Sequence, residues 1–267
     1  MPYPLGAQII SVCGRLPLLG AFLRRIADSY REGSVVTILA GHLAGSKWKR
    51  SHRHVNGYWL GIYELAVQRC LVRQLRPGNV FYDIGSNAGF FTLLGSQRVG
   101  PTGRVFAFEP ESEHVPCIRS QLALNGIRNC TLVNAAVANV DGYVDLVIDG
   151  RTSRSHVRRR YERRDCRSVS VRAVRLDDFT RTSPAPDLIK LDIEGGEADA
   201  LQGARRLLSS ELPPKILIEF HGRELRRECL TVLSEFKYSF QSLDVSDHAD
   251  VPCGRHVLCM PPGRSPS

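Results

Sequence analysis

The residues best suited to chemistry lie where short apolar runs end. The polar residues at these ends are Asp83, Glu109, Asn134, Asp192 and Glu219. Helical stretches separate most of the runs, and this alternation predicts parallel strands. Parallel strands place their carboxyl ends at one edge of a sheet, where ligands bind. We therefore expect the five side chains to surround one site.

A glycine-rich turn follows the first of these strands. Its sequence is Asp83-Ile84-Gly85-Ser86-Asn87-Ala88-Gly89. Glycine permits a tight turn and lets a ligand approach the backbone closely, and the helix that follows offers free N–H groups. A dinucleotide fingerprint needs a glycine where Asn87 stands, and no Gly-Lys-Ser/Thr follows as in a phosphate-binding P-loop. The turn therefore favours a nucleotide-like ligand without a pyrophosphate.

Two carboxylates narrow the class of ligand further. The carboxylate of Asp83 would repel a phosphate. It suits a cationic amino group, such as the amino group of a cofactor that contains methionine. Glu109 follows 26 residues later, and an acidic group at this strand end accepts hydrogen bonds from ribose hydroxyls. Pro110 then directs the chain away from the strand. The pattern indicates an adenosyl cofactor without phosphate.

The apolar and polar periodicity predicts an α/β fold. Strands are expected over 80–83, 104–108, 131–133, 188–192, 215–220 and 255–259, and helices over 57–76, 88–98, 112–125, 197–209 and 223–236. Residues 144–148 and 169–174 alternate as the strands of an antiparallel hairpin do. Lys190 lies two residues before Asp192 in one strand, so both side chains point the same way, and Lys190 is expected to pair with a nearby carboxylate.

The net charge of +9 is concentrated in one segment, because residues 151–181 contain eleven arginines. Such a run suits nucleic acid, anionic lipid or an acidic substrate. Stacking on bases needs aromatic side chains, and here only Tyr161 and Phe179 interleave. We therefore interpret the run as a solvated loop and hairpin, and we expect no nucleic-acid partner.

The first 56 residues are predicted to form an N-terminal arm, and residues 57–267 the main domain. The arm is basic and turn-rich, and a short amphipathic helix is expected near residues 16–25. The apolar stretch is too short to span a membrane. Packing on the domain is favoured, and peripheral membrane contact through the arm is the alternative. Eight scattered cysteines without a Cys-x-x-Cys pair favour a cytoplasmic location.

The ordered set of motifs resembles the FkbM-type methyltransferases over roughly residues 57–222. The segments that carry the resemblance are Gly57-Tyr58-Trp59-Leu60-Gly61-Ile62-Tyr63-Glu64, the stretch Val80 to Thr92, Val105 to Pro110, Asn134 to Val137, Leu176 to Phe179, Asp187 to Glu197 and Ile218 to His221. The resemblance implies a Rossmann-like, seven-stranded methyltransferase fold, here with a helical N-terminal arm and an inserted Arg-rich hairpin. It also implies methyl transfer from S-adenosylmethionine, typically to oxygen.

The same resemblance implies where the cofactor binds. Residues 83–89, which include Gly85, Ser86, Asn87 and Gly89, would hold the methionine part of the cofactor. Glu109 and Pro110 would bind its ribose, and Asn134 and Ala135 would lie near its adenine. Ser86 stands where alanine is usual in the family. Tyr63 and Glu64 are expected to close over the pocket, with plain helix packing as the alternative. Family acceptors are sugar or natural-product hydroxyls, so a small-molecule or glycan partner is expected.

A sugar hydroxyl is a poor nucleophile, so a base or a metal ion should assist. His221 and Asp192 are the candidate bases, with Glu194 beside them, and Asp192 is alternatively a cofactor ligand. Asp192, Glu219 and His221 together would suit Mg²⁺ as a second cofactor. The competing function is methylation of a nucleic acid or protein held by residues 151–181. The sequence leaves a homo-oligomer open.

Overall fold

A computed structural model describes residues 31–51, 55–148, 155–157, 167–243 and 255–263. Its centre is a seven-stranded sheet in the order β12-β13-β11-β10-β3-β4-β5. The strands are β3 (Val80–Ile84), β4 (Arg104–Phe108), β5 (Cys130–Val133), β10 (Leu188–Leu191), β11 (Lys215–Glu219), β12 (Ser239–Ser242) and β13 (His256–Met260). Only β13 runs against its neighbours. The predicted α/β fold with a seven-stranded central sheet is confirmed.

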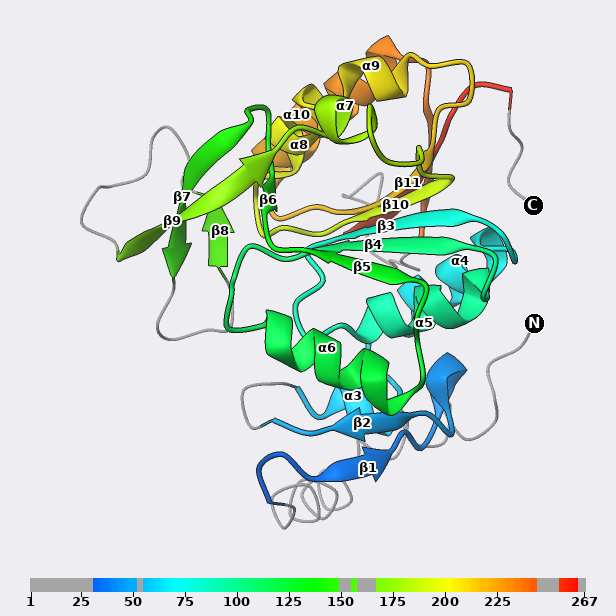
Figure 1. Ribbon diagram of the computed structural model, residues 1–267. Coiled ribbons are helices and arrows are strands. Elements are labelled where there is room, and N and C mark those ends of the chain that lie inside the picture. The colour runs from blue at the N-terminus through cyan, green and yellow to red at the C-terminus, as the bar shows by residue number, and fades with distance from the viewer. Residues whose placement is uncertain (1–30, 52–54, 149–154, 158–166, 244–254, 264–267) are drawn as a thin grey trace.

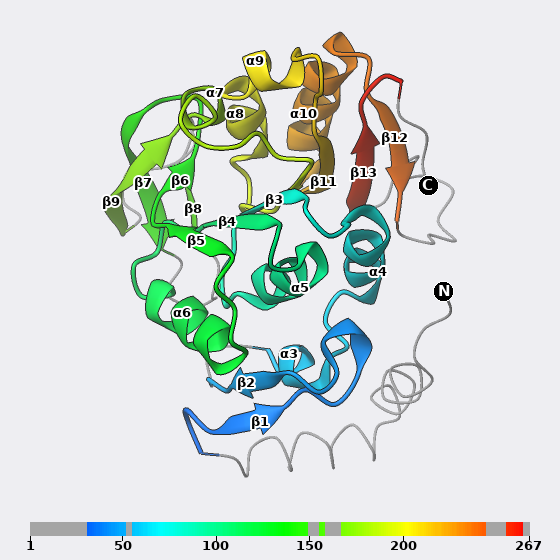
Figure 2. The same cartoon turned by 45° about the vertical axis from the view of Figure 1, so that its right-hand side comes forward.

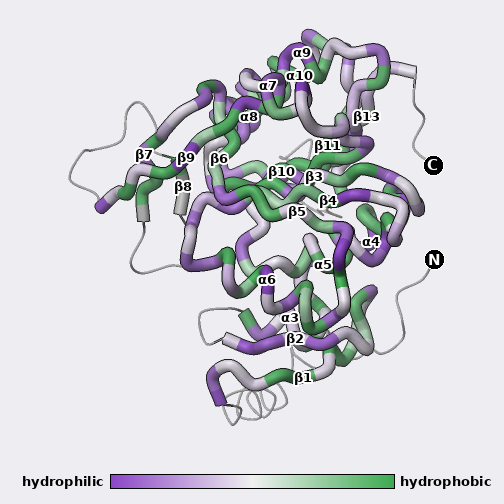
Figure 3. Tube along the Cα trace, in the orientation of Figure 1, coloured by the Kyte–Doolittle hydropathy of each residue, from purple (hydrophilic) through white to green (hydrophobic). Residues whose placement is uncertain are grey.

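Helices cover both faces of this sheet (Figure 1). One face carries α4 (Leu65–Gln74), α5 (Phe90–Val99) and α6 (Val115–Leu124), and the other carries α7 (Leu176–Phe179), α8 (Glu197–Gln202), α9 (Arg205–Leu208) and α10 (Arg223–Glu235). Successive strand residues point to opposite faces, so Phe81 and Tyr82 belong to different hydrophobic clusters. The central strands are accordingly mostly hydrophobic along their length (Figure 3).

Three details of the sheet and helices differ from the prediction. The helix expected over 57–76 is broken into α3 (Gly57–Leu60) and α4, because Gly61 turns the chain with a φ of 77°. A Cβ at Gly61 would lie 1.9 Å from the carbonyl oxygen of Ala40. The helix expected over 197–209 is likewise two short helices, α8 and α9. Strand β12 was not predicted.

The predicted hairpin is confirmed and belongs to a second, smaller sheet. This sheet has the order β6-β9-β7-β8, with β6 (Ala136–Val137), β7 (Gly142–Ile148), β8 (Ser155–Val157) and β9 (Ser168–Val174). Strands β7 and β9 are antiparallel, and Val144 lies opposite Val171. Because β6 follows β5 closely, the smaller sheet stands beside the carboxyl ends of the central strands (Figure 2). Seven of the eleven arginines in 151–181 lie outside the described residues.

The described part of the arm forms a strand hairpin. It comprises β1 (Val35–Thr37), the 3-10 helix η1 (Gly41–Leu43) and β2 (Lys47–Lys49). Trp48 of β2 is buried in the same hydrophobic cluster as α4 and α5, and Gln121 of α6 exchanges hydrogen bonds with the backbone of Lys49. The helix predicted near 16–25 lies outside the described residues. In the parts of the chain described, no helix is long and apolar enough to cross a bilayer.

Candidate functional site

A cavity of about 340 Å³ opens at the carboxyl ends of the central strands. Ligand pockets commonly have volumes of this order or larger. Of the predicted site residues, the cavity wall contains Glu64, Gly85, Ser86, Asn87, Glu109, Pro110, Ala135, Asp192, Glu194 and Glu219. Asp83, Gly89, Asn134 and His221 lie behind this wall. The structure therefore brings most of the predicted residues to one place, as the strand-end pattern indicated.

The glycine-rich turn is locked between two neighbouring strands. The backbone N–H groups of Gly85 and Ser86 both donate to the carbonyl of Phe108 at the end of β4, over 3.0 and 3.1 Å. Gly85 has a φ of 83°, and a Cβ there would lie 1.8 Å from the carbonyl oxygen of Asp192. Only glycine allows the turn to pack this closely on the chain after β10.

Asp83 supports this turn from beneath and does not line the cavity. Its carboxylate is fully buried, and the Thr92 hydroxyl donates to its Oδ2 over 2.6 Å. Burial raises the pKa of Asp83, while Lys190 and Thr92 act in the opposite direction. Asp83 is therefore not placed at the cavity surface, where the predicted direct contact with an amino group would be made; Gly85, Ser86 and Asn87 line the cavity instead.

Glu109 is the carboxylate at one end of the cavity. The backbone N–H groups of Asn87 and Glu111 donate to its two oxygens over 2.7 and 2.9 Å, and His114 Nδ1 lies 3.4 Å away. Burial lowers the pKa of His114, but the hydrogen bond and charge of Glu109 and the charges of its neighbours raise it overall. The fixed carboxylate retains lone pairs for ribose hydroxyls. Asn134 holds the strand end by donating to the Glu109 carbonyl over 2.7 Å.

An apolar slot in the cavity wall adjoins Glu109. Phe108 lines it from the end of β4, Ala135 from the link between β5 and β6, and Leu146 and Val157 from the smaller sheet. The inserted hairpin therefore forms part of the cavity wall, which the sequence analysis did not predict. The alternation of apolar and polar residues predicts the strands of the hairpin, but it does not show that they would cover the cavity.

Lys190 and Asp192 form the centre of the opposite end of the cavity. Lys190 Nζ lies 2.8 Å from Asp192 Oδ2, which confirms the predicted pairing, and 5.0 Å from the centre of the Phe91 ring. Burial alone would lower the pKa of Lys190, but the charges of Asp192, Asp83 and Glu64 raise it. The ammonium group is therefore a fixed cation among carboxylates.

His221 lies behind Asp192 and is surrounded by carboxylates. Its Nδ1 is 2.8 Å from Glu197 Oε1, and its Nε2 is 3.2 Å from Glu194 Oε2. Burial alone would lower the pKa of His221, but its hydrogen bond with Glu197, its contact with Glu219 and the nearby charges raise it to about 10. With no metal bound, the imidazole is a cation near neutral pH. This argues against His221 as a general base and leaves Asp192 as the better candidate.

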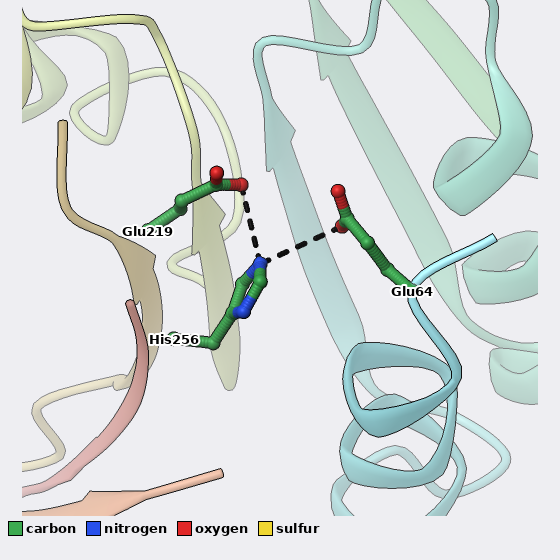
Figure 4. Close-up of side chains that lie close together, drawn as sticks. All are labelled: Glu64, Glu219 and His256. Atoms are coloured by element: carbon green, nitrogen blue, oxygen red, sulfur yellow. Dashed lines mark ion pairs between the residues drawn. The ribbon is translucent and has the colours of Figure 1, made fainter. Parts of the chain in front are cut away.

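A second histidine, His256, reaches the same region from β13 (Figure 4). Its Nε2 lies 3.3 Å from Glu219 Oε2 and 3.8 Å from Glu64 Oε2. Glu64 precedes α4 with a φ of 41°, and burial raises its pKa. Burial also acts to raise the pKa of Glu219, but its contacts with both histidines lower it overall. Arg255 contacts Glu219 as well and lines the cavity.

Sequence reasoning missed His256, Arg255 and the contact of Glu197 with His221. The first two lie at the start of an antiparallel strand, so the rule for carboxyl ends of parallel strands did not include them. The predicted metal ligands, in contrast, do meet: one atom each of Asp192, Glu219 and His221 lies within 4.8 Å of the others.

Comparison with known proteins identifies the family. Residues 83–250 match the methyltransferase FkbM domain. Hexuronic acid methyltransferase AglP of Haloferax volcanii is 24% identical over 195 residues, covering 72% of this chain and 77% of that protein. An arsenite methyltransferase of Halobacterium salinarum is 28% identical over 127 residues, which are 44% of this chain and 32% of the relative.

Among solved structures, an S-adenosylmethionine-dependent O-methyltransferase from Thermotoga maritima aligns with a TM-score of 0.47 and 13% identity, covering 91% of this chain and 83% of its own. The chain belongs to the FkbM methyltransferase family. It is a methyltransferase of the S-adenosylmethionine-dependent class.

Proposed function

We propose that the protein methylates a hydroxyl group of a sugar or a related polyhydroxylated acceptor. The observation that supports this is the make-up of a single cavity. At one end lies Glu109, a carboxylate suited to binding ribose hydroxyls. At the other end lie the carboxylates of Asp192 and Glu194, beside aromatic side chains.

The first end fits the adenosyl part of the cofactor. The slot formed by Phe108, Leu146 and Val157 is apolar, as an adenine ring requires, and Glu109 is held with its oxygens toward the cavity. When bound, S-adenosylmethionine supplies an electrophilic methyl group. Glu64 lies nearer the other end, where it would face the methionine part. These residues bind and orient the cofactor, and none of them needs to change its protonation state.

The second end fits an acceptor with hydroxyl groups. Lys190 occupies Asp192 Oδ2, so Oδ1 is the oxygen that would accept the hydroxyl proton. Tyr58 and Tyr63 line the same end and offer ring surfaces for the apolar face of a sugar. For the protein without a bound metal ion, we propose Asp192 as the base and His221 as a cation that helps to hold the carboxylates in place. Mg²⁺ is compatible with this arrangement but is not required by it.

A uronic acid is the first acceptor to test. The relative AglP is named a hexuronic acid methyltransferase. In this chain the half-exposed guanidinium of Arg255 lies in the cavity wall. Arginine binds carboxylates through two parallel hydrogen bonds, so Arg255 would suit the carboxylate of such a sugar. The proposed partner is therefore an acidic glycan or its small-molecule precursor rather than a nucleic acid.

The test measures transfer of a labelled methyl group to a glucuronide, the matching neutral glucoside, RNA and a mixed protein sample. We expect transfer to a sugar hydroxyl, faster with the glucuronide, and a large loss in Asp192→Asn. Asp199→Asn is the matched control, because Asp199 lies on α8 and pairs with Asn139 outside the cavity. Transfer confined to RNA or protein would instead support the competing function. Repeating the assay with EDTA and with Mg²⁺ tests the metal requirement.

A further inference from the structure

The surroundings of His221 Nε2 are unusual for a histidine that serves only as a positive charge. Three carboxylate oxygens stand around this nitrogen, at 3.2 Å (Glu194 Oε2), 3.4 Å (Glu219 Oε1) and 3.7 Å (Asp192 Oδ1). The side chain is only 10% exposed, yet Nε2 makes no hydrogen bond. Buried polar atoms without a hydrogen bond are rare and call for an explanation.

The spacing of these atoms matches the edges of a coordination polyhedron. Two ligand atoms about 2.1 Å from one ion, at tetrahedral or octahedral angles, are separated by about 3.0 to 3.4 Å. Two of the three distances from Nε2 lie within this range, and the third needs a small shift of Asp192. A hydrogen-bonded imidazolium would instead place at least one oxygen near 2.8 Å, which is about the usual length of such bonds.

The other ring nitrogen has the partner that a metal-bound histidine needs. His221 Nδ1 lies 2.8 Å from Glu197 Oε1, and Glu197 is completely buried. The backbone N–H groups of Ile193 and Gly195 donate to the same oxygen and fix it. Metal-ligating histidines commonly donate their second N–H to a carboxylate, which orients the ring and directs the free nitrogen at the ion. Glu197 does not line the cavity, so an acceptor does not explain its burial.

We propose that His221, Asp192 and Glu219, whose ligand atoms lie within 4.8 Å of one another, bind one divalent transition-metal ion with the neighbouring Glu194 as a further ligand; Mn²⁺ is the appropriate probe. One imidazole nitrogen with three carboxylate oxygens suits Mn²⁺ better than Mg²⁺, which prefers an all-oxygen shell. With His221 neutral as a metal ligand, the four carboxylates of this group and Glu197 outnumber the three basic side chains that contact them, Lys190, Arg255 and His256. An added divalent cation therefore lowers the excess of negative charge.

The group formed by Glu64, Glu219 and His256 is the alternative position for an ion (Figure 4). In both groups one histidine and two carboxylates meet within 4.8 Å, and in this one the carboxylates lie 3.3 and 3.8 Å from His256 Nε2. Glu219 belongs to both groups: its Oε1, which Arg255 also contacts, faces His221, and its Oε2 faces His256. The site at His221 is favoured because a further carboxylate, Glu194, lies 3.2 Å from Nε2 and because the buried carboxylate of Glu197 lies behind the ring.

The catalytic consequence rests on the proposed function: an acceptor hydroxyl beside Asp192 would lie next to the ion, and a bound cation lowers the pKa of such a hydroxyl. The binding itself is tested without an acceptor. The full chain, freed of metal with EDTA, is titrated with Mn²⁺, and free Mn²⁺ is followed by electron paramagnetic resonance at neutral and alkaline pH. We expect one tightly bound ion per chain.

Variants identify the ligands. We expect His221→Gln and Glu194→Gln to weaken Mn²⁺ binding by about tenfold or more, and His256→Gln to change it by no more than about threefold. Glu194 is partly exposed, so its substitution should leave folding intact. Binding of S-adenosylhomocysteine is measured in the same samples; its absence would overturn the proposed function without affecting the Mn²⁺ result. Failure of Mn²⁺ to bind at either pH, or an equal loss in His256→Gln, would overturn the assignment of this site.

Discussion

The two ends of the cavity are held by different kinds of interaction. At the Glu109 end, backbone groups fix the geometry: two N–H groups hold the carboxylate, and the turn at Gly85 packs directly on the chain after β10. At the Asp192 end, charged side chains fix one another, with Lys190 and Arg255 among carboxylates and two histidines. The first end suits a ligand of constant shape, and the second can be adapted to different acceptors by exchanging side chains.

The largest expected effect comes from the backbone-held end. In Gly85→Ala, the new Cβ would meet the Asp192 carbonyl at 1.8 Å, in a left-handed conformation. We expect the free energy of unfolding in urea to fall by at least about 4 kcal/mol. Gly45→Ala is the matched control, since its φ of 87° is similar but nothing lies within 4 Å of its Cβ, and it should lose only about 1–2 kcal/mol. Equal losses of stability in the two variants would mean that the close packing of Gly85 on the Asp192 carbonyl does not limit the residue at this position.

The charged end should respond next most strongly. Lys190→Met removes the cation that lies between Asp192, Asp83 and Glu64 and leaves buried carboxylates uncompensated. We expect a loss of about 3–5 kcal/mol in the free energy of unfolding. Lys215→Met, in the neighbouring strand, removes a hydrogen bond to Gln74 and should cost only about 1 kcal/mol. Chemical denaturation of both variants compares the two positions, and a loss near that of Lys215→Met would show that Lys190 is not needed to compensate this charge.

The sequence predicts the parts of this site that follow from strand order. The strand-end rule located Glu109, Asp192 and Glu219, because the order of the parallel strands brings their carboxyl ends together. It was less successful with Asp83, whose carboxylate lies one layer below the cavity. Periodicity identifies a strand end but does not determine whether the last polar side chain points into the cavity or under the turn.

The remaining differences arise from contacts between segments that are distant in the sequence. The break after α3 depends on Gly61 meeting the carbonyl of Ala40, and the arm's strand hairpin depends on Gln121 of α6. The high pKa of His221 depends on Glu197, which is 24 residues away. A helical pattern around residues 57–76 shows none of these partners, so such features cannot be deduced from local residue patterns.

A smaller effect is expected on cofactor affinity, and it again distinguishes the two ends of the cavity. Glu109→Gln replaces a charged acceptor of ribose hydrogen bonds by a neutral amide. We expect the dissociation constant for S-adenosylhomocysteine to rise by about tenfold to hundredfold, since hydrogen bonds to charged groups are worth about 1.5–3 kcal/mol. Glu113→Gln is the control, because Glu113 is exposed near the same helix start. Calorimetry showing equal affinities for the two variants would remove Glu109 from the ribose site.

The smallest expected effect tests whether the inserted hairpin belongs to the backbone-held end. Val157 of β8 lines the apolar slot, and Val157→Thr keeps its shape while adding a hydroxyl that an adenine ring would desolvate. We expect S-adenosylhomocysteine to bind about fivefold more weakly, or about 1 kcal/mol, with no change in stability beyond that size. Val169→Thr on β9 is the matched change at a partly exposed position outside the cavity wall. If both variants bind S-adenosylhomocysteine as tightly as the unaltered protein does, Val157 does not contact the adenine ring. The hairpin would then contribute to acceptor recognition or to neither end of the cavity.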